Sequence, residues 1–241
     1  MTNENQLKVK LFADGANLEN MLTIYKDPNI KGFTTNPTLM KKAGITDYEK
    51  FAKQVLLEIP DLPVSFEVFA DDLDDMFDQA KVITSWGSNV NVKIPVTNTK
   101  GEFTGPIIKE LSAAGVQLNI TAVFTPVQVK AIAENLSLDT HAIASVFAGR
   151  IADSCLDPMP IMRECVEILK DLPKAELLWA SPREVLNIIQ ADEVGCHIIT
   201  ATPDILGKLK LLGKDLSEFS LETVQMFYDD AQAAGYSINI T

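Results

Sequence analysis

Short apolar runs alternate with longer amphipathic stretches along almost the whole chain. Eight of these runs have the length and the alternation of buried β-strands. They lie at 9–14, 32–35, 64–69, 90–94, 117–121, 143–147, 176–180 and 197–200. The stretches between them are long enough for helices, and 46–58 and 161–171 show the amphipathic helical period. Consecutive runs lie roughly 20 to 35 residues apart, which is the spacing of βα units.

The joints between strands and helical stretches share one form, a capping residue followed by proline. It occurs at Asn36-Pro37, Thr125-Pro126, Asp157-Pro158, Ser181-Pro182 and Thr202-Pro203. The capping side chain accepts from free N–H groups of the first helical turn, and proline fits the first helical position because it has no N–H group to satisfy. Four of the pairs closely follow a predicted strand, so the pattern predicts βα loops.

Eight strands that alternate with helices predict a (β/α)8 TIM barrel, in which residues 1–241 form a single domain. An open, doubly wound sheet is the alternative, and it usually carries a glycine-rich phosphate loop after its first strand. The first strand here is followed by "GANLEN", with a single glycine, which favours the barrel. Residues 216–234 have the pattern of an extra amphipathic helix. We expect 216–241 to form a helical extension that covers the barrel or docks on a neighbouring subunit.

The composition and charge of the chain exclude some classes of binding partner and some cellular locations. The chain is 46% apolar, which is enough for one large core. Its net charge of −12 argues against nucleic acid and against anionic membrane surfaces. No apolar run reaches the ~18 residues of a membrane span, and the polar N-terminus lacks the apolar segment of a signal peptide. Three separated cysteines fit reduced thiols, so we expect a cytoplasmic protein.

Polar residues interrupt the first five predicted strands near their carboxyl ends. In "VNVKI" (90–94), Asn91 and Lys93 point away from the three apolar residues. The same alternation, with the strand ends, gathers these polar side chains at the barrel interior: Asp14, Thr34, Thr35, Asn36, Ser65, Glu67, Asn91, Lys93, Asn119 and Thr121. Barrel enzymes keep their active sites at this end of the strands, so we expect the site there.

Lys93 is the most unusual member of this set, because a buried ammonium group without a partner is strongly destabilising. It avoids that penalty by losing its proton, and a neutral buried amine is a nucleophile that forms Schiff bases with carbonyl compounds. Two structural alternatives stay open. Lys93 could be an ion-pair partner of Asp14 or Glu67 without chemistry, or it could lie at the strand end and reach solvent.

Two of the three arginines directly follow predicted strands, Arg150 after the sixth and Arg183 after the seventh. A planar guanidinium suits the paired oxygens of a phosphate, and Arg183 is expected to open a helix behind Ser181-Pro182. We therefore expect an anion site there, although each arginine alone also fits an ordinary surface charge. Arg163 falls in the helical stretch 161–171, between the sixth and seventh predicted strands, and is expected at the surface.

The histidines and cysteines show no metal-binding pattern. The chain has two histidines, His141 and His197, and neither an HExxH nor an HxH motif. His141 precedes the sixth predicted strand and His197 opens the eighth, which puts both near the amino-terminal end of the barrel. We therefore expect no metal ion and no other cofactor.

Seven stretches resemble the transaldolase family, class I aldolases whose Schiff-base lysine lies on the fourth strand of a barrel. They are "FADGAN", "GFTTNPTLM", "FEVFAD", "NVKIPVT", "LNITAVF", "SVFAGRIAD" and "WASPR", between about residues 8 and 212. "TTNP" followed by "VKIPVT" and "FAGRI" in this order is highly specific. The chain length and the closing helix are similar to the short branch of the family, which includes fructose-6-phosphate aldolases.

The resemblance implies a catalytic role for four residues. Lys93 would attack the ketone of a ketose phosphate and form the imine. Asp14 would take the proton of the C4 hydroxyl as the C3–C4 bond breaks, which requires a raised pKa for work near neutral pH. Glu67 and Thr121 would hold a water molecule that shuttles protons during imine formation.

Substrate contacts are implied for eight further residues: Thr35, Asn36, Asn119, Ser145, Phe147, Arg150, Ser181 and Arg183. The two asparagines, with help from Ser145, would hydrogen-bond the dihydroxyacetone part of the sugar. The two arginines and Ser181 would hold its phosphate. One departure is Pro182, where an aromatic residue is usual between the serine and the basic residue.

Glu67 and Phe147 stand where the simple fructose-6-phosphate aldolases carry glutamine and tyrosine, which indicates a true transaldolase. Such an enzyme passes a dihydroxyacetone unit from sedoheptulose 7-phosphate or fructose 6-phosphate to an aldose phosphate. An aldolase that releases free dihydroxyacetone and a non-catalytic sugar-phosphate-binding barrel are the alternatives. We expect sugar phosphates as small-molecule partners and a homo-oligomer, either a dimer, a pentamer or a decamer.

Overall fold

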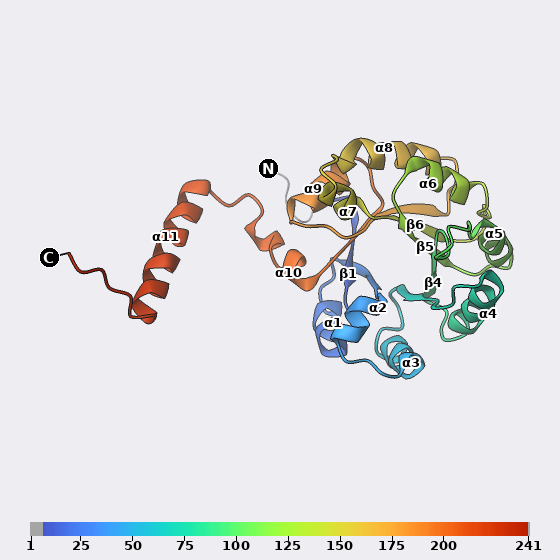
Figure 1. Ribbon diagram of the computed structural model, residues 1–241, viewed down its shortest axis with the longest axis horizontal. Coiled ribbons are helices and arrows are strands. Elements are labelled where there is room, and N and C mark those ends of the chain that lie inside the picture. Colours follow the sequence, from blue (N-terminus) through green and yellow to red (C-terminus); the bar gives the residue numbers. More distant parts are fainter. Residues whose placement is uncertain (1–6, 241) are drawn as a thin grey trace.

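The computed structural model describes residues 7–240, and eight parallel strands form a closed barrel with helices around it (Figure 1). The strands are β1 (Lys10–Asp14), β2 (Ile30–Thr34), β3 (Val64–Glu67), β4 (Val90–Pro95), β5 (Leu118–Val123), β6 (Ala142–Val146), β7 (Ala175–Trp179) and β8 (Ile198–Ala201). The helices are α1 (Leu18–Tyr25), α2 (Pro37–Lys42), α3 (Tyr48–Glu58), α4 (Leu73–Thr84), α5 (Gly105–Ala113), α6 (Pro126–Ala133), α7 (Ala148–Asp153), α8 (Pro158–Leu169), α9 (Leu186–Glu193), α10 (Pro203–Leu206) and α11 (Leu216–Ala233), with the 3-10 turn η2 (Leu209–Leu211) before α11. The predicted (β/α)8 TIM barrel with an extra C-terminal helix is confirmed.

The strands pair in chain order, and β1 closes the ring by pairing with β8. Each predicted strand is present, and the largest displacement of an end is two residues, as at β2, which begins at Ile30 rather than at position 32. The register aligns Glu67 of β3 with Lys93 of β4. Charged groups of adjacent strands therefore meet at the carboxyl end of the barrel.

Helices begin as predicted at four of the capping pairs. The side chains of Asn36, Thr125 and Asp157 accept hydrogen bonds from first-turn N–H groups of α2, α6 and α8. Thr202 precedes α10 without such a bond, and Pro203 takes the first helical position. The capping side chains accept from N–H groups that the first helical turn leaves free, and proline has no such group. The sequence therefore predicts these four helix starts correctly.

The prediction of a helix directly after Ser181-Pro182 is wrong. Helix α9 begins at Leu186, and Ser181 lies in the left-handed region with φ of 57°. The side chain of Asn187 accepts from the Arg183 amide at 2.7 Å. Because this loop turns before the helix starts, Arg183 does not occupy a helix N-terminus.

The barrel interior is divided into an apolar half and a polar half. An apolar cluster fills the side formed by β1, β6, β7 and β8: Phe12, Ile143, Leu178, Ala180 and Ile198. The ring of Phe12 takes the space of a side chain at Gly32, where a Cβ atom would lie 2.5 Å from the ring. The opposite side carries the buried polar residues Ser65, Asn91 and Asn119. The deeper polar side chains therefore lie on the β3, β4 and β5 side, whereas Asp14, Ser145 and Thr200 add polar groups nearer the carboxyl ends of β1, β6 and β8.

Charged side chains close the amino-terminal end of the barrel. Glu176 accepts from Lys10 Nζ at 2.5 Å and from His141 Nε2 at 2.8 Å. His197 lies nearby, and its Nδ1 accepts from the Leu177 amide at 3.0 Å. Both histidines therefore lie at the end of the barrel that the sequence predicts.

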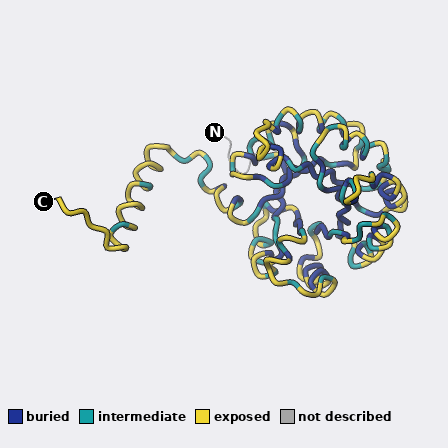
Figure 2. Tube along the Cα trace, viewed as in Figure 1, coloured by how far each residue is buried: buried dark blue, intermediate teal, exposed yellow. Residues whose placement is uncertain are grey.

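Helix α11 stands away from the barrel, and none of its residues is buried (Figures 1 and 2). Its exposed apolar side chains are Leu216, Phe219, Leu221, Val224, Met226, Phe227 and Tyr228. The predicted extra helix exists, but it does not cover the barrel of its own chain. Although α11 has 18 residues, neither it nor any other helix in residues 7–240 has the length and apolarity that a bilayer crossing needs.

Candidate active site

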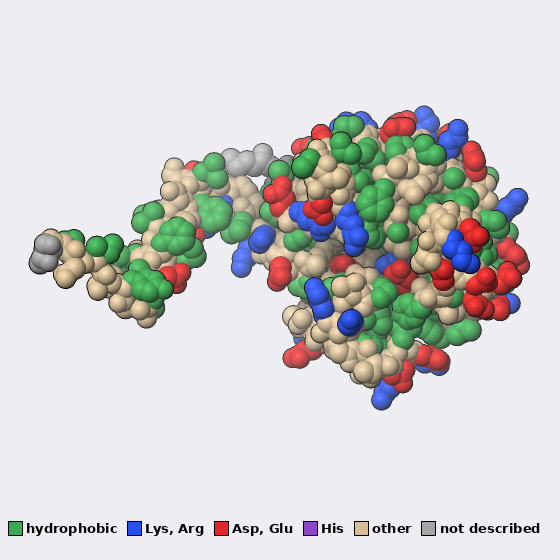
Figure 3. Space-filling model, in the orientation of Figure 1, with side chains coloured by type: hydrophobic (Ala, Val, Ile, Leu, Met, Phe, Trp, Pro, Cys, Tyr) green, Lys and Arg blue, Asp and Glu red, His purple; other side chains and the backbone are tan. Residues whose placement is uncertain are grey.

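A cavity of about 530 Å³ opens at the carboxyl ends of the strands. Its wall includes every predicted site residue except Thr35: Asp14, Asn36, Glu67, Lys93, Asn119, Thr121, Ser145, Phe147, Arg150, Ser181 and Arg183. On this face of the molecule, Lys and Arg side chains stand beside a central hollow (Figure 3). The fold thus brings the predicted residues together from seven strands and their loops, and Thr200 of the eighth strand also lines the cavity.

Lys93 lies inside the barrel and is only 7% exposed. Its Nζ donates to the Thr35 carbonyl oxygen at 2.8 Å and lies 3.1 Å from Glu67 Oε2. The ion pair with Glu67, one of the two structural alternatives, is therefore present, and Lys93 does not extend into solvent. Because both residues also line the cavity, the pair is open to a small molecule.

Thr35 contributes to the site through its backbone and not through its side chain. Its hydroxyl donates to the Ser65 carbonyl oxygen at 2.8 Å, and the residue is fully buried. The side chain is therefore not part of the cavity wall, and its substrate contact stays a prediction. The carbonyl oxygen instead holds the amine of Lys93.

Asp14 ends β1 at the edge of the cavity. Thr34 Oγ1 donates to Asp14 Oδ1 at 2.8 Å and lies 2.5 Å from Thr200 Oγ1, which donates in turn to Thr34. Burial raises the pKa of the Asp14 carboxyl, and the charge of Lys93 and hydrogen bonds from Thr34 and Asn36 oppose this change only in part. The pKa of Asp14 therefore shifts in the direction that a base near neutral pH needs.

The sequence did not identify Thr200 as a site residue, and Thr34 was named only as a polar strand end. Both line the cavity and support Asp14. The signal for Thr200 was the alternation within 197–200, which directs it and Ile198 to the same face. A threonine on the interior face at the carboxyl end of a predicted strand would have indicated that Thr200 lines the site.

A row of hydrogen-bonded side chains joins β6, β5 and β3 inside the barrel. Ser145 Oγ donates to Asn119 Oδ1 at 2.6 Å, and Asn119 Nδ2 donates to Ser65 Oγ at 3.0 Å. This row holds the Asn119 amide in one orientation at the cavity wall. Asn91 lies deeper on β4, and its amide has no hydrogen-bond partner among the described protein atoms.

Arg150 and Arg183 lie at one side of the cavity mouth. The guanidinium of Arg150 stands over the Phe147 ring at 5.4 Å from its centroid. Arg183 Nε donates to Asp153 Oδ1 at 2.9 Å, and a second N–H of Arg183 bonds the other oxygen. Hydrogen bonds from Arg183 lower the pKa of the Asp153 carboxyl. The mouth therefore carries an oriented pair of cations beside Ser181, which suits an anion.

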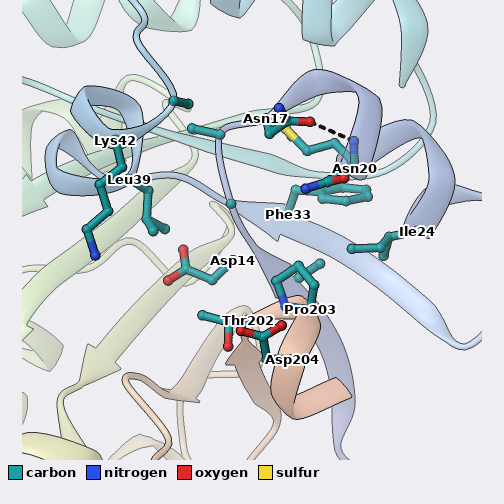
Figure 4. Close-up of a pocket in the computed structure, with 15 residues that line it drawn as sticks. Asp14, Asn17, Asn20, Ile24, Phe33, Leu39, Lys42, Thr202, Pro203 and Asp204 are labelled. Atoms are coloured by element: carbon teal, nitrogen blue, oxygen red, sulfur yellow. Dashed lines mark hydrogen bonds between the residues drawn. The ribbon is translucent and has the colours of Figure 1, made fainter. Parts of the chain in front are cut away.

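A second cavity, of about 490 Å³, meets the first at Asp14 and Leu39 (Figure 4). It lies between α1, α2 and α10, and its polar residues include Lys42 and Asp204. Figure 4 shows Asp14 between these two side chains. Asp14 is therefore reached from two sides.

The chemistry of the site follows from its side chains. Within the part of the chain that the structure describes, no group of three or more His, Cys, Asp or Glu side chains could hold a metal ion. A buried amine beside one carboxylate, with a second carboxyl on the same wall, is suited to addition to a carbonyl group and to proton transfer. The arginines at the mouth add a place for a charged end of the same molecule.

Comparison with known proteins gives consistent matches in sequence and fold. The sequence profile of the family Transaldolase/Fructose-6-phosphate aldolase matches residues 11–239. A protein of Dehalococcoides mccartyi named "Probable transaldolase" is 36% identical over 199 residues, which cover 82% of this chain and 88% of that protein. A protein of Nitrosopumilus maritimus with the same name is 31% identical over 234 residues, 96% of this chain and 100% of that protein.

Among solved structures, dihydrodipicolinate synthase from Rhodopseudomonas palustris superposes with a TM-score of 0.57. The superposition covers 95% of this chain and 81% of that structure, at 14% sequence identity. At this identity the likeness concerns the fold alone, and it agrees with the closed barrel seen here.

Proposed function

This chain belongs to the transaldolase/fructose-6-phosphate aldolase family, and we propose that within it the protein is a transaldolase. In this proposal it transfers a dihydroxyacetone unit from sedoheptulose 7-phosphate or fructose 6-phosphate to an aldose phosphate through an imine on Lys93. One observation carries the proposal: the Lys93 amine is buried in the wall of a cavity, 3.1 Å from the carboxylate of Glu67.

Imine formation begins when the neutral amine of Lys93 adds to the C2 carbonyl of the ketose. The amine must first give up its proton, and the Glu67 carboxylate is close enough to accept it. The resulting carbinolamine loses water, and a water molecule held by Glu67 and Thr121 moves protons between the amine, the leaving hydroxyl and the carboxylate. The Thr35 carbonyl orients the amine before attack, because it accepts from Nζ at 2.8 Å.

Cleavage of the C3–C4 bond follows, with Asp14 as the base. Its carboxylate takes the proton of the C4 hydroxyl, and the aldose phosphate leaves as an aldehyde. The electron pair of the broken bond passes into the protonated imine to form a neutral enamine. The enamine then attacks the acceptor aldehyde, and the same steps run in reverse. Asn36, Asn119 and Ser145 hold the hydroxyl groups of the dihydroxyacetone unit during the exchange.

Arg150, Ser181 and Arg183 bind the phosphate of donor and acceptor in turn. The two guanidinium groups and the serine lie at one side of the mouth, and the ring of Phe147 supports Arg150. A phosphate held there directs the sugar toward Lys93 at the centre of the barrel. We assign the enzyme to the cytoplasm and to the pentose phosphate pathway, where such sugar phosphates are exchanged.

A second candidate activity is aldol cleavage with release of free dihydroxyacetone. Glu67 and Phe147 favour the transaldolase, because the simple aldolases of this family carry glutamine and tyrosine there. The experiment compares turnover of fructose 6-phosphate with and without erythrose 4-phosphate. We expect turnover only with the acceptor, and turnover that does not depend on the acceptor would instead identify an aldolase.

Borohydride reduction in the presence of fructose 6-phosphate tests the Schiff base directly. The reduced adduct of dihydroxyacetone should appear on the peptide that contains Lys93 and on no other peptide. Lys93→Met should abolish the adduct and the activity, whereas Lys53→Met, at a surface ion pair with Glu49, should change neither. An unmodified Lys93 under conditions of demonstrated turnover would exclude this mechanism, and wild-type activity of Lys93→Met would support a non-catalytic role for the lysine.

The exposed helix α11 supports the further proposal of a homo-oligomer. A row of exposed apolar side chains on a helix of which no residue is buried against residues 7–240 is typical of a surface that another subunit covers. A second copy of this chain is the simplest occupant, because it provides the same helix and the same barrel.

A further inference from the structure

The hydrogen-bond ladder between β2 and β3 stops just before the catalytic end of the barrel. Its last bonds run from the Phe33 amide to the Pro63 carbonyl at 2.9 Å and from the Thr35 amide to the Ser65 carbonyl at 3.3 Å. In a parallel ladder the next bond would join the Glu67 amide to the Thr35 carbonyl. That carbonyl accepts from Lys93 Nζ instead.

The hydroxyl of Tyr48 takes the place of the missing ladder partner. Tyr48 Oη accepts from the Glu67 amide at 2.7 Å and donates to the Glu67 carbonyl oxygen at 2.9 Å. One side-chain oxygen thus satisfies both backbone groups of Glu67, which a neighbouring strand would otherwise serve. Tyr48 is the first residue of α3, so the helix packed beside β3 supplies this hydroxyl.

Aromatic neighbours hold the Tyr48 ring in position. Its centroid lies 4.6 Å from that of Phe69, 5.4 Å from that of Trp86 and 6.1 Å from that of Phe66. Burial also raises the pKa of the Tyr48 phenol, so the hydroxyl keeps the proton that it donates to Glu67. The packed ring therefore holds the Tyr48 hydroxyl in place for its two hydrogen bonds to Glu67.

We propose that Tyr48 is a positioning residue for imine formation, an inference that rests on the proposed function. Its hydroxyl replaces the Thr35 carbonyl as the partner of the Glu67 amide, which leaves that carbonyl free to hold the Lys93 amine. At the same time it fixes the end of β3, so that the Glu67 carboxylate stays 3.1 Å from the amine. Tyr48 touches no substrate and acts through Glu67 and Thr35.

Removal of the Tyr48 hydroxyl should change the hydrogen-bond partner of the Glu67 amide. In Tyr48→Phe the Glu67 amide loses its acceptor, and the nearest replacement is the Thr35 carbonyl, which would then be withdrawn from Lys93. We expect the rate of imine formation and kcat to fall at least tenfold, whereas KM should change less than twofold because the residues proposed to bind the phosphate and the sugar hydroxyl groups are unaltered. Tyr25→Phe is the matched control, since it removes a surface hydroxyl that bonds Asp61, and it should behave like the wild type.

The experiment measures borohydride trapping at Lys93 in single turnover with fructose 6-phosphate, for the wild type and both variants, at a temperature where thermal unfolding shows all three to be folded. A Tyr48→Phe protein that traps at the wild-type rate overturns the inference, as does a loss of rate that Tyr25→Phe shares. If the wild type itself forms no adduct, the proposed function fails and not only the role of Tyr48.

Replacement of Tyr48 by p-aminophenylalanine provides a second variant in case Tyr48→Phe does not fold. The amino group can donate to the Glu67 carbonyl oxygen and can accept weakly from its amide. We expect it to retain at least a third of the wild-type trapping rate. A folded p-aminophenylalanine variant that traps at less than a third of the wild-type rate would overturn the inference.

Discussion

Gly149 and Ser181 touch through their backbones, so that a Cβ atom at position 149 would lie 1.5 Å from the Ser181 carbonyl oxygen. The Gly149 amide also donates to the Ala180 carbonyl at 3.3 Å. Only glycine permits such an approach of α7 to the loop after β7. Because Arg150 follows Gly149 directly and Arg183 follows Ser181 by two residues, the contact sets the spacing of the arginines at the cavity mouth.

Gly149→Ala should therefore damage both the fold and the anion site. The added methyl group must push the Ser181 backbone away, which we expect to lower the free energy of unfolding by roughly 1–3 kcal/mol and to raise KM for phosphorylated sugars. Urea unfolding and steady-state kinetics measure the two effects. In Gly15→Ala the new Cβ meets no atom within 4 Å, so its stability should stay within about 0.5 kcal/mol of the wild type. Wild-type stability and KM in Gly149→Ala would contradict this prediction, because they would show that the loop at Ser181 moves away from the new methyl group without cost.

Arg183→Ala should weaken binding of phosphorylated sugars far more than binding of free dihydroxyacetone. The guanidinium is a phosphate ligand in the proposed function, so we expect KM for fructose 6-phosphate to rise about tenfold. Asp153→Asn should act in the opposite direction, because it removes the carboxylate that pairs with Arg183. Equal effects of Arg183→Ala on both classes of substrate would remove this residue from the anion site.

Asp14→Asn should lose activity and gain stability at neutral pH. Loss of the base should lower kcat by about 10²–10⁴-fold. Burial raises the pKa of Asp14 above its ordinary value of 3.8, so the folded chain binds this proton more tightly than the unfolded chain. Ionisation as pH rises past 3.8 therefore lowers the free energy of unfolding, and the asparagine avoids that loss.

The measurement for Asp14→Asn is urea unfolding of the variant and the wild type from pH 3.5 to pH 8. The stability advantage of the variant should grow with pH and then level off once the folded carboxyl is fully ionised. A variant that is less stable than the wild type at neutral pH would contradict the raised pKa.

Glu176→Gln should destabilise the protein at neutral pH and not in strong acid. Burial pushes the pKa of Glu176 upward, but the hydrogen bonds and charges of His141 and Lys10 outweigh it and hold the pKa at about 2, below the ordinary 4.5. The stabilisation is fully present above pH 4.5 and is lost as pH falls toward 2. We expect the variant to lose roughly 1–3 kcal/mol of unfolding free energy at pH 7.

Chemical denaturation at pH 7, 4 and 2.5 would follow the Glu176→Gln difference as it shrinks. Glu167→Gln is a suitable control, since Glu167 pairs with Lys170 on an exposed face of α8 and should change stability little at any pH. A difference for Glu176→Gln that does not depend on pH would exclude the charged pair as its source.

Phe227→Glu should weaken assembly of the proposed homo-oligomer without disturbing the barrel. Phe227 is 63% exposed on α11, and a charge there would oppose burial against another subunit. Sedimentation velocity should show smaller species than the wild type, whereas Asp230→Asn on the same helix should sediment as the wild type does. A wild-type protein that sediments as a monomer would remove the basis of this proposal.

The sequence alone determined the order of the elements and which polar side chains gather at the carboxyl ends of the strands. Strand and helix periods depend on residues a few positions apart, so the eight strands and four helix starts could be predicted within two residues. Alternation along each strand also decides which side chains face the interior, and that rule identified Glu67 and Lys93. These properties are local, and the closed barrel preserves them.

Only the tertiary structure decided which partner each of these groups has. Asp153 lies 30 positions from Arg183, and Tyr48 lies 19 positions from Glu67. No local sequence pattern therefore predicts either contact. The turn at Ser181 likewise lies against Gly149 of a distant segment, and α9 begins only at Leu186. Hydrogen bonds between distant segments form only when packing brings the groups together, and the period of the chain carries no information about them.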